Sequence, residues 1–328
     1  MQFGGGGIPP VGVLFDGAFD RIGDLLALAV LYGLQSKGEM RVTAISVNRP
    51  DFAAAQFCDV VKNFYGFGGG LPIGAADGKQ SPLAVYANLL AKTDDGGAPV
   101  YKPALKRFID SADPATVLRN ALTASQPRNS IIVASGSLAT VARVLSLRGS
   151  KPLIEGTVRH AVIAEPKVPA DASERLKAQQ FFDEWPAPLY LCGADIGDAI
   201  RYPADSIEKD FAGPRANPIA GAYRAFGDMP YDAPTAPADA ALFAVRTSMN
   251  YFKLSEPGTF RVSASGEIEF EPSAAGKQRR LTLDDAQKDN VVKALTQLAS
   301  APPRGGGRGR GRGGANANAN QQPPVKKQ

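Results

Sequence analysis

Three aspartates follow one another through a single turn near the start of the chain. Asp16 ends an apolar run typical of a strand, Asp20 lies in the turn, and Asp24 begins an apolar run typical of a helix. Carboxylate oxygens are the ligands that Ca²⁺ and Mg²⁺ prefer, and open parallel sheets bind ligands outside the carboxyl ends of their strands. The turn therefore predicts a hard-metal site, with helix capping and solubility as the competing explanation of these carboxylates.

The segments around the turn alternate between strands and helices. Apolar residues from 25 to 34 predict a helix buried on most of its circumference. Residues 42–48 predict a second strand that ends in Asn48, and residues 53–65 predict a second helix. Strands joined by short loops to longer helices are typical of βαβ units. We therefore expect an α/β fold with a doubly wound, mostly parallel sheet.

The remaining periodicity completes this outline. Further helices are expected at residues 83–91, 114–124, 138–147, 172–184, 218–226 and 238–247, and strands at 130–134, 161–164 and 188–191. Residues 259–270 alternate between apolar and polar side chains around Ser265 and Gly266, which predicts a small β-hairpin near the C-terminus. An amphipathic helix over residues 283–299 is expected to close the domain.

Composition predicts one structured region between two different ends. Of the 328 residues, 44% are hydrophobic and 21% are charged, which is ordinary for a globular protein. We expect a flexible N-terminus over residues 1–10, one domain over 11–300, and a disordered basic tail over 301–328. The tail holds six basic residues and no acid, which leaves 31 basic and 32 acidic residues elsewhere. The +5 net charge therefore arises in the tail.

The Arg-Gly and Ala-Asn repeats of the tail have no aromatic or branched residue before Val325, so they cannot build a core. A solvated extension is the first interpretation, and weak nucleic-acid binding through phosphate charge is the second. Deleting the residues after Ala301 is expected to lower the isoelectric point to about neutral or below and to leave the melting temperature within roughly 2 °C. Calorimetry of the truncated chain tests this, and a cooperative loss of structure would contradict it.

Cysteine and histidine add little chemistry. Cys58 and Cys192 both lie in apolar segments, which favours buried free thiols over a disulfide. His160 precedes a strand, which favours a surface or core-edge role over catalysis. No apolar run reaches the roughly 18 residues of a membrane span, and the first residues lack the pattern of a signal peptide. The sequence as written predicts a cytoplasmic protein, or a periplasmic or secreted one if a leader was removed.

Five collinear stretches resemble the inosine-uridine preferring nucleoside hydrolase family, in its bacterial branch. Residues 13–28 resemble its Asp-Thr-Asp start followed by Asp-Asp-Ala-Leu-Ala-Leu, 131–142 its Gly-Pro-Leu-Thr-Asn segment, 164–171 its Glu-aromatic-Asn motif, 192–200 its Ser-Gly-Phe-Glu-Ile-Gly segment, and 233–246 its Pro-Thr-Trp-Asp segment. The resemblance covers about residues 11–299. It implies a nucleoside hydrolase-like fold, a nucleoside or sugar-like ligand, and a homo-oligomer, either a dimer or a tetramer.

The resemblance also implies a reaction and a set of site residues. In the family a Ca²⁺ ion binds the ribose hydroxyls and the attacking water, and an aspartate takes the proton of that water while the N-glycosidic bond breaks. Carried onto this chain, the expected roles are catalytic for Asp16 and Asp20, ribose-binding for Asn48, Glu165, Lys167 and Asp195, and metal-binding for Asp24, the Ser135 carbonyl and Asp239.

The metal-site motif nevertheless departs from the family at most positions. Gly23 stands at an expected aspartate, Gly17 or Ala18 stands at the ligand-and-base position, and residues 236–237 replace Trp-Asp with Ala-Pro. Lys167 replaces an asparagine with a cation that would repel a nearby Ca²⁺ and could instead reach an acidic side chain. Two hypotheses follow. The chain is a nucleoside N-ribohydrolase whose Ca²⁺ is held by shifted aspartates, or it is a degenerate member that acts as a ligand-binding or assembly subunit.

Overall fold

A long, mostly parallel sheet forms the centre of the structure. The computed structural model describes residues 9–66, 70–79, 82–169, 171–213 and 215–303. Within them the strand order is β11-β10-β12-β6-β5-β4-β1-β2-β3, with β9 paired to β12. The parallel strands are β1 (Val11–Gly17), β2 (Met40–Val47), β3 (Ile73–Ala75), β4 (Ser130–Ser137), β5 (Val158–Lys167), β6 (Leu189–Cys192) and β12 (Gln278–Thr282).

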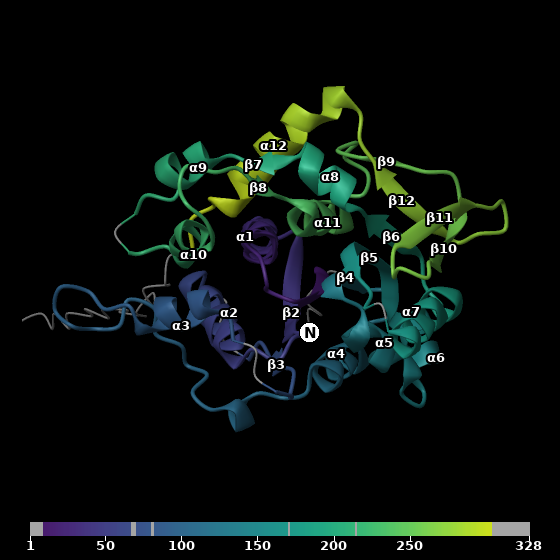
Figure 1. The fold of residues 1–328 in the computed structure, drawn as a ribbon, viewed down its shortest axis with the longest axis horizontal. Helices are drawn as coiled ribbons and strands as arrows, with labels where there is room; N and C mark the ends of the chain where they lie inside the picture. The colour runs from purple at the N-terminus through teal and green to yellow at the C-terminus, as the bar shows by residue number, and fades with distance from the viewer. Residues whose placement is uncertain (1–8, 67–69, 80–81, 170, 214, 304–328) are drawn as a thin grey trace, which may run out of the picture.

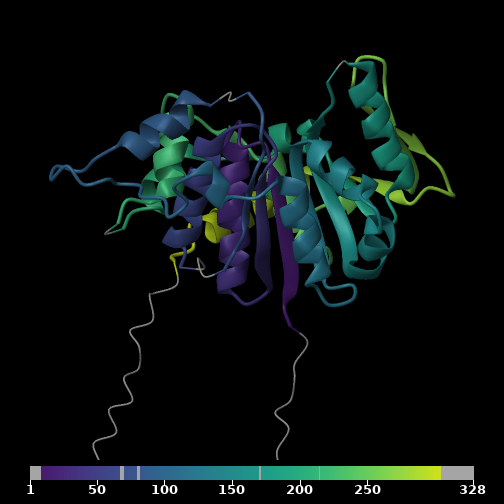
Figure 2. The ribbon, with the colours of Figure 1, turned by 90° about the horizontal axis from the view of Figure 1, so that it is seen from below.

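An antiparallel hairpin extends one end of this sheet. β10 (Gly258–Val262) pairs with β11 (Ile268–Pro272) on one side and with β12 on the other. Figure 2 shows the hairpin, in yellow-green, at one end of the molecule and β1, in purple, near its middle. β9 (Lys253–Leu254) is a short partner of β12, while β7 (Arg201–Tyr202) and β8 (Ala233–Pro234) form a separate small ribbon. The predicted hairpin is therefore present, and the predicted α/β sheet is confirmed.

Helices cover both faces of the sheet, as a doubly wound fold requires (Figure 1). One face carries α1 (Ile22–Ser36), α2 (Phe52–Phe64), α3 (Ala84–Ala91), α10 (Pro218–Phe226), α11 (Ala236–Val245) and α12 (Asp285–Ala299), around one hydrophobic cluster. The other face carries α4 (Pro114–Thr123), α5 (Ala139–Ser146), α6 (Ser150–Thr157) and α7 (Ala172–Glu184), around a second cluster. The short helices η1 (Phe108–Asp110), α8 (Ala194–Ala199) and α9 (Ala204–Lys209) lie in the connections.

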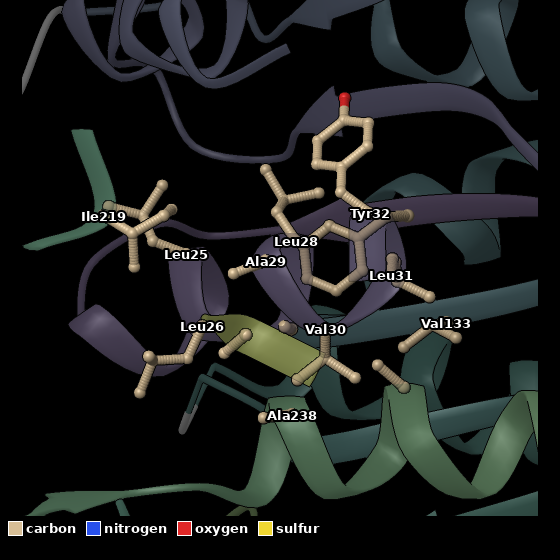
Figure 3. Packing of buried hydrophobic residues seen from close by; sticks show 14 of the residues in the cluster. Leu25, Leu26, Leu28, Ala29, Val30, Leu31, Tyr32, Val133, Ile219 and Ala238 are labelled. Carbon is tan, nitrogen blue, oxygen red and sulfur yellow. The ribbon is translucent and has the colours of Figure 1, made fainter. Parts of the chain in front are cut away.

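Helix α1 is the centre of the first cluster. Every residue from Ile22 to Leu34 is buried, which confirms the all-round burial predicted from its apolar run. Figure 3 shows its leucines packed against Val133 of β4, Ile219 of α10 and Ala238 of α11. α12 also packs on α1, and it approaches so closely at Gly33 that an added Cβ would stand 2.2 Å from the carbonyl oxygen of Leu298. The helix that follows the acidic turn is thus held rigidly in place.

Several elements differ from their predicted bounds. α11 begins at Ala236 rather than at residue 238, and β5 runs from Val158 to Lys167 rather than over 161–164 only. β12 was not expected, because its sequence Gln-Arg-Arg-Leu-Thr looks polar, and only Gln278 and Leu281 in it are buried. α6, α8 and α9 were also not expected, since each has eight residues or fewer.

Both cysteines are free and buried, as predicted. His160 is buried beside Ala244, its Nε2 lies 2.9 Å from that carbonyl oxygen, and burial lowers its pKa to about 4. No helix in the described part of the chain is long and apolar enough to cross a membrane. Residues 1–8 and 304–328 lie outside the described residues, and the predictions for the N-terminus and the tail fall largely there.

Candidate functional site at the carboxyl ends of the parallel strands

The expected site residues meet where four parallel strands end. Asp16 in β1 is paired in register with Ser46 of β2 and with Ala134 of β4, and Ser135 of β4 is paired with Ala164 of β5. Asn48 follows β2, and Glu165 lies in the last part of β5. Because parallel strands bring their carboxyl ends to one edge, this edge is where an open α/β sheet binds ligands.

Asp16 is fully buried and bonded to its neighbours. Ser46 Oγ donates a short hydrogen bond to Asp16 Oδ1, and Asn48 Nδ2 donates to Oδ2 at 3.1 Å. Burial raises the pKa of Asp16 to about 7, because removal from water disfavours the charged carboxylate more than these donors favour it. Asn48 Nδ2 also lies 3.1 Å from the carbonyl oxygen of Ser135 and 3.3 Å from that of Ser137. The amide of Asn48 therefore ties β1, β2 and β4 together.

Asp24 closes the acidic turn. The backbone N–H of Phe19 donates to Asp24 Oδ2 at 2.8 Å, and both residues are fully buried. Burial raises the pKa of Asp24, while the nearby Arg21 guanidinium acts in the opposite direction. Phe19 itself has φ of 51°, a left-handed conformation that few residues other than glycine adopt. The Phe19 ring lies edge-on against Phe15 at 5.7 Å and fills space inside the turn.

Two cations lie among the carboxylates. Arg21, the residue that precedes α1, forms an ion pair with Glu165, and its Nη2 lies 3.5 Å from Ser135 Oγ. Lys167 Nζ lies 2.8 Å from Asp20 Oδ2, so it contacts an acidic side chain as its charge suggests. The Lys167 side chain is 60% exposed, whereas that of Arg21 is 26% exposed. Arg21 is thus the inner cation and Lys167 the outer one.

The other two expected residues have different partners. Asp195 at the start of α8 forms an ion pair with Arg280 of β12 at 2.7 Å. Asp239 in α11 is fully buried, accepts a hydrogen bond from Thr235 Oγ at 2.8 Å, and has its pKa raised well above the usual range by burial. No hydrogen bond or ion pair described for these two residues joins them to Asp16 or Asp24. The structure therefore gathers Asp16, Asp24, Asn48, Ser135, Glu165, Asp20 and Lys167 and leaves Asp195 and Asp239 beside the group.

The geometry of these side chains does not fit the Ca²⁺ ion that the resemblance implies. Ca²⁺ takes six to eight oxygen ligands, yet the described residues contain no group of three or more histidine, cysteine, aspartate or glutamate side chains arranged to hold a metal. Asp20 Oδ1, Asp24 Oδ1, Asn48 Oδ1 and Asp239 Oδ1 are buried oxygens without a hydrogen-bond donor in the described residues, but the main charge that acts on Asp24 is the Arg21 guanidinium, which opposes the effect of burial and lowers its pKa. We derive no reaction step through a metal.

Two cavities flank the end of β5. A cavity of about 520 Å³ is lined by Glu165, Pro166, Lys167, Leu191, Gly193, Ala194, Glu267, Ile268 and Glu269. A second one, of about 490 Å³, lies between α5 and α7, with an apolar floor that includes Leu138 and Phe181. Lys167 lines both cavities. The first cavity opens beside the carboxylate group, because it shares Glu165 with the ion pair to Arg21.

Sequence reasoning missed two members of the group, Arg21 and Ser46. Ser46 lies in the predicted second strand, two residues before Asn48, and the alternation of side chains along a strand was a usable signal for placing both on one face. Arg21 stands between Asp20 and Asp24 in the acidic turn, where a lone cation among acids marks an expected ion pair.

No protein-family model matches the sequence, and the comparison with curated proteins gives no match. Solved structures do match. A purine-preferring ribonucleoside hydrolase from Gardnerella vaginalis has 12% identity and a TM-score of 0.64, covering 88% of this chain and 98% of its own. An inosine-uridine preferring nucleoside hydrolase from Bacillus anthracis has 15% identity and a TM-score of 0.63, covering 88% and 99%. A plant nucleoside hydrolase has 16% identity and a TM-score of 0.65, covering 90% and 100%. The chain therefore has the nucleoside hydrolase fold.

Proposed function

We propose that this nucleoside hydrolase-like protein binds a nucleoside-like or sugar-like ligand without hydrolysing it. The burial of Asp16, one of the two residues expected to act as base, carries the proposal, and the other, Asp20, is paired with Lys167. A general base must come within hydrogen-bond reach of the water that it activates. Both oxygens of Asp16 are instead engaged by Ser46 and Asn48 inside the fold. The degenerate, ligand-binding alternative is therefore the one that the geometry favours.

The cavity beside the carboxylates supports a ligand of nucleoside size. Its volume of about 520 Å³ falls within the range of small-molecule sites. Glu165 and Lys167 on its wall supply an acceptor and a donor for sugar hydroxyls. Two proteins with the same fold are named as a purine-preferring ribonucleoside hydrolase and an inosine-uridine preferring nucleoside hydrolase. Ribose-containing molecules are thus the first ligands to test.

One observation favours the second candidate, a nucleoside N-ribohydrolase. The pKa of Asp16 is raised to about 7, which suits a general base that works near neutral pH. The oxygens of Asp20 and Asp24 without donors would also accept hydrogen bonds from a ligand. This function requires the turn around Phe19 to open, since Asp16 is fully buried in the described structure.

Calorimetric titration with inosine, uridine and ribose, with and without Ca²⁺, tests the proposal. We expect binding that needs no added Ca²⁺, and no release of ribose from either nucleoside or from a p-nitrophenyl riboside. Lys167→Ala is expected to weaken binding about ten-fold, because a hydrogen bond to a charged group contributes about 1.5 kcal/mol.

Lys253→Ala is the matched control, because Lys253 also forms an exposed ion pair, with Asp284, and neither residue lines the cavity. Its affinity should equal that of the unchanged protein. Release of ribose that requires Ca²⁺ would establish the hydrolase instead. Failure of all three compounds to bind, with no turnover, would refute both functions.

The finer implications of the resemblance extend the proposal. They are the inosine and uridine preference of the bacterial branch, a homodimer or homotetramer, and weak nucleic-acid contact through the Arg-Gly tail. Sedimentation equilibrium measures the oligomeric state directly. A salt titration of RNA binding, with and without the tail, measures the nucleic-acid contact.

A further inference from the structure

Arg21 links three separate elements of the candidate site. It directly precedes α1 in an extended backbone conformation, with φ of −151° and ψ of 161°. Its guanidinium pairs with Glu165 of β5, lies 3.5 Å from Ser135 Oγ of β4, and lowers the pKa of Asp24 in α1 against the larger effect of burial. A single positive group therefore contacts or influences the side chains that a bound cation would have to hold.

The carboxylates need such a group. Asp16 and Asp24 are fully buried, and like-charge repulsion from Asp24 also raises the pKa of Asp16, while that from Asp20 raises the pKa of Asp24. Lys167, the residue that the sequence suggested as the replacement for a metal, pairs with Asp20 on the outside. The Glu165 side chain is only 11% exposed, so its partner Arg21 acts where screening by water is weakest.

The backbone beside this ion pair is also unusual. Glu165 has φ of 39° and Phe19 has φ of 51°, both in the left-handed region that favours glycine. The Phe19 turn is closed by its N–H bond to Asp24, and Glu165 is held by Arg21. Both left-handed residues therefore lie in the segments that carry the carboxylates of the site.

We infer that Arg21 is a built-in cation that balances the carboxylates in place of a divalent ion. The charge of Arg21 then excludes Ca²⁺ from the site while this side chain is present. The inference deepens the proposed function and rests on it for the position of the ligand site. The inference is tested without any nucleoside, so its failure can be distinguished from a failure of ligand binding.

Thermal melting and calorimetry with Ca²⁺ or EDTA test the inference. The unchanged protein is expected to show no Ca²⁺ binding and the same melting temperature in both. Arg21→Ala opens the carboxylate group, and about 5 mM Ca²⁺ is expected to raise its melting temperature by about 2 °C or more through mass action. Arg21→Lys keeps the charge and should show no rise.

Arg224→Ala is the matched control, because Arg224 forms an exposed ion pair with Glu208 on α9. It too should be insensitive to Ca²⁺. A rise in the melting temperature of the unchanged protein with Ca²⁺ would overturn the inference. An Arg21→Ala variant without a Ca²⁺ response would also overturn it, whether that variant melts cooperatively or stays unfolded in both solutions. Recovery of an unfolded Arg21→Ala variant by Ca²⁺, followed by circular dichroism, would support it.

Discussion

Gly33→Ala is expected to destabilise the fold by about 2 kcal/mol or more. The added Cβ would stand 2.2 Å from the carbonyl oxygen of Leu298, which is backbone and cannot rotate away. α1 and α12 must then separate, and overpacking of this kind costs about 1–3 kcal/mol and occasionally more. The better helix propensity of alanine recovers about 1 kcal/mol at most. Urea denaturation measures the loss, and the melting temperature should fall by roughly 4–8 °C.

Gly156→Ala provides the matched control in another helix. Gly156 lies in α6, and its added Cβ would meet no atom within 4 Å. The same substitution there is expected to be neutral or to stabilise the protein by up to about 1 kcal/mol. If both variants have equal stability, α12 does not pack on α1 as described.

The titration of Asp16 is expected to lower the stability of the fold as the pH rises from about 4 to about 7, whereas that of buried His160, whose pKa is lowered to about 4, raises it over part of this interval. Asp16 has a pKa of about 7 in the folded protein against 3.8 as its ordinary value, with burial as the main cause. In that interval the folded state holds the Asp16 proton more tightly than the unfolded state, so the contribution of Asp16 to stability is full below pH 4 and is lost as the pH passes its folded pKa. Three pKa units correspond to about 4 kcal/mol as an upper bound. Burial also raises the pKa values of Asp24 and Asp239, which act in the same direction.

Urea midpoints measured at intervals between pH 4 and pH 8 test this profile. Asp16→Asn has no such titration, so its stability relative to that of the unchanged protein should increase from pH 4 to pH 7, and its loss of stability should be smallest at high pH. Asp198→Asn, at an exposed position, should leave the slope unchanged. A difference in stability between the unchanged protein and Asp16→Asn that stays constant from pH 4 to pH 8 would contradict the burial of Asp16.

The sequence predicts the position of the site better than its internal contacts. Asp16 and Asn48 could be placed at one edge because parallel strands end together, a rule that needs only strand positions. The ion pair between Arg21 and Glu165 could not be predicted, because it depends on Glu165 adopting φ of 39° at the end of a strand. Local propensity favours extended backbone there, and the tertiary ion pair overrides it.

The fold was also predictable where the sequence pattern is local, and not where an element depends on tertiary contacts. Apolar runs identify α1 and β1, because burial on all sides leaves no polar positions. β12 escapes this reasoning, since Gln278 is buried through hydrogen bonds rather than apolar contact, with its side-chain atoms at 2.6 Å from the N–H of Phe260 and the carbonyl oxygen of Phe182. A strand that is completed by amide hydrogen bonds has no hydrophobic pattern to detect.

The hairpin that ends the sheet has a consequence for how copies of this chain can associate. β11 is the outer strand, and its exposed residues Glu269, Glu271 and Pro272 place two negative charges and a missing N–H donor along the free edge. The opposite outer strand, β3, has only three residues. β3 is also bridged on its outer side, between Gly74 and Ala112, so neither outer strand favours strand-to-strand addition, and a dimer or tetramer is expected to form through helices and loops.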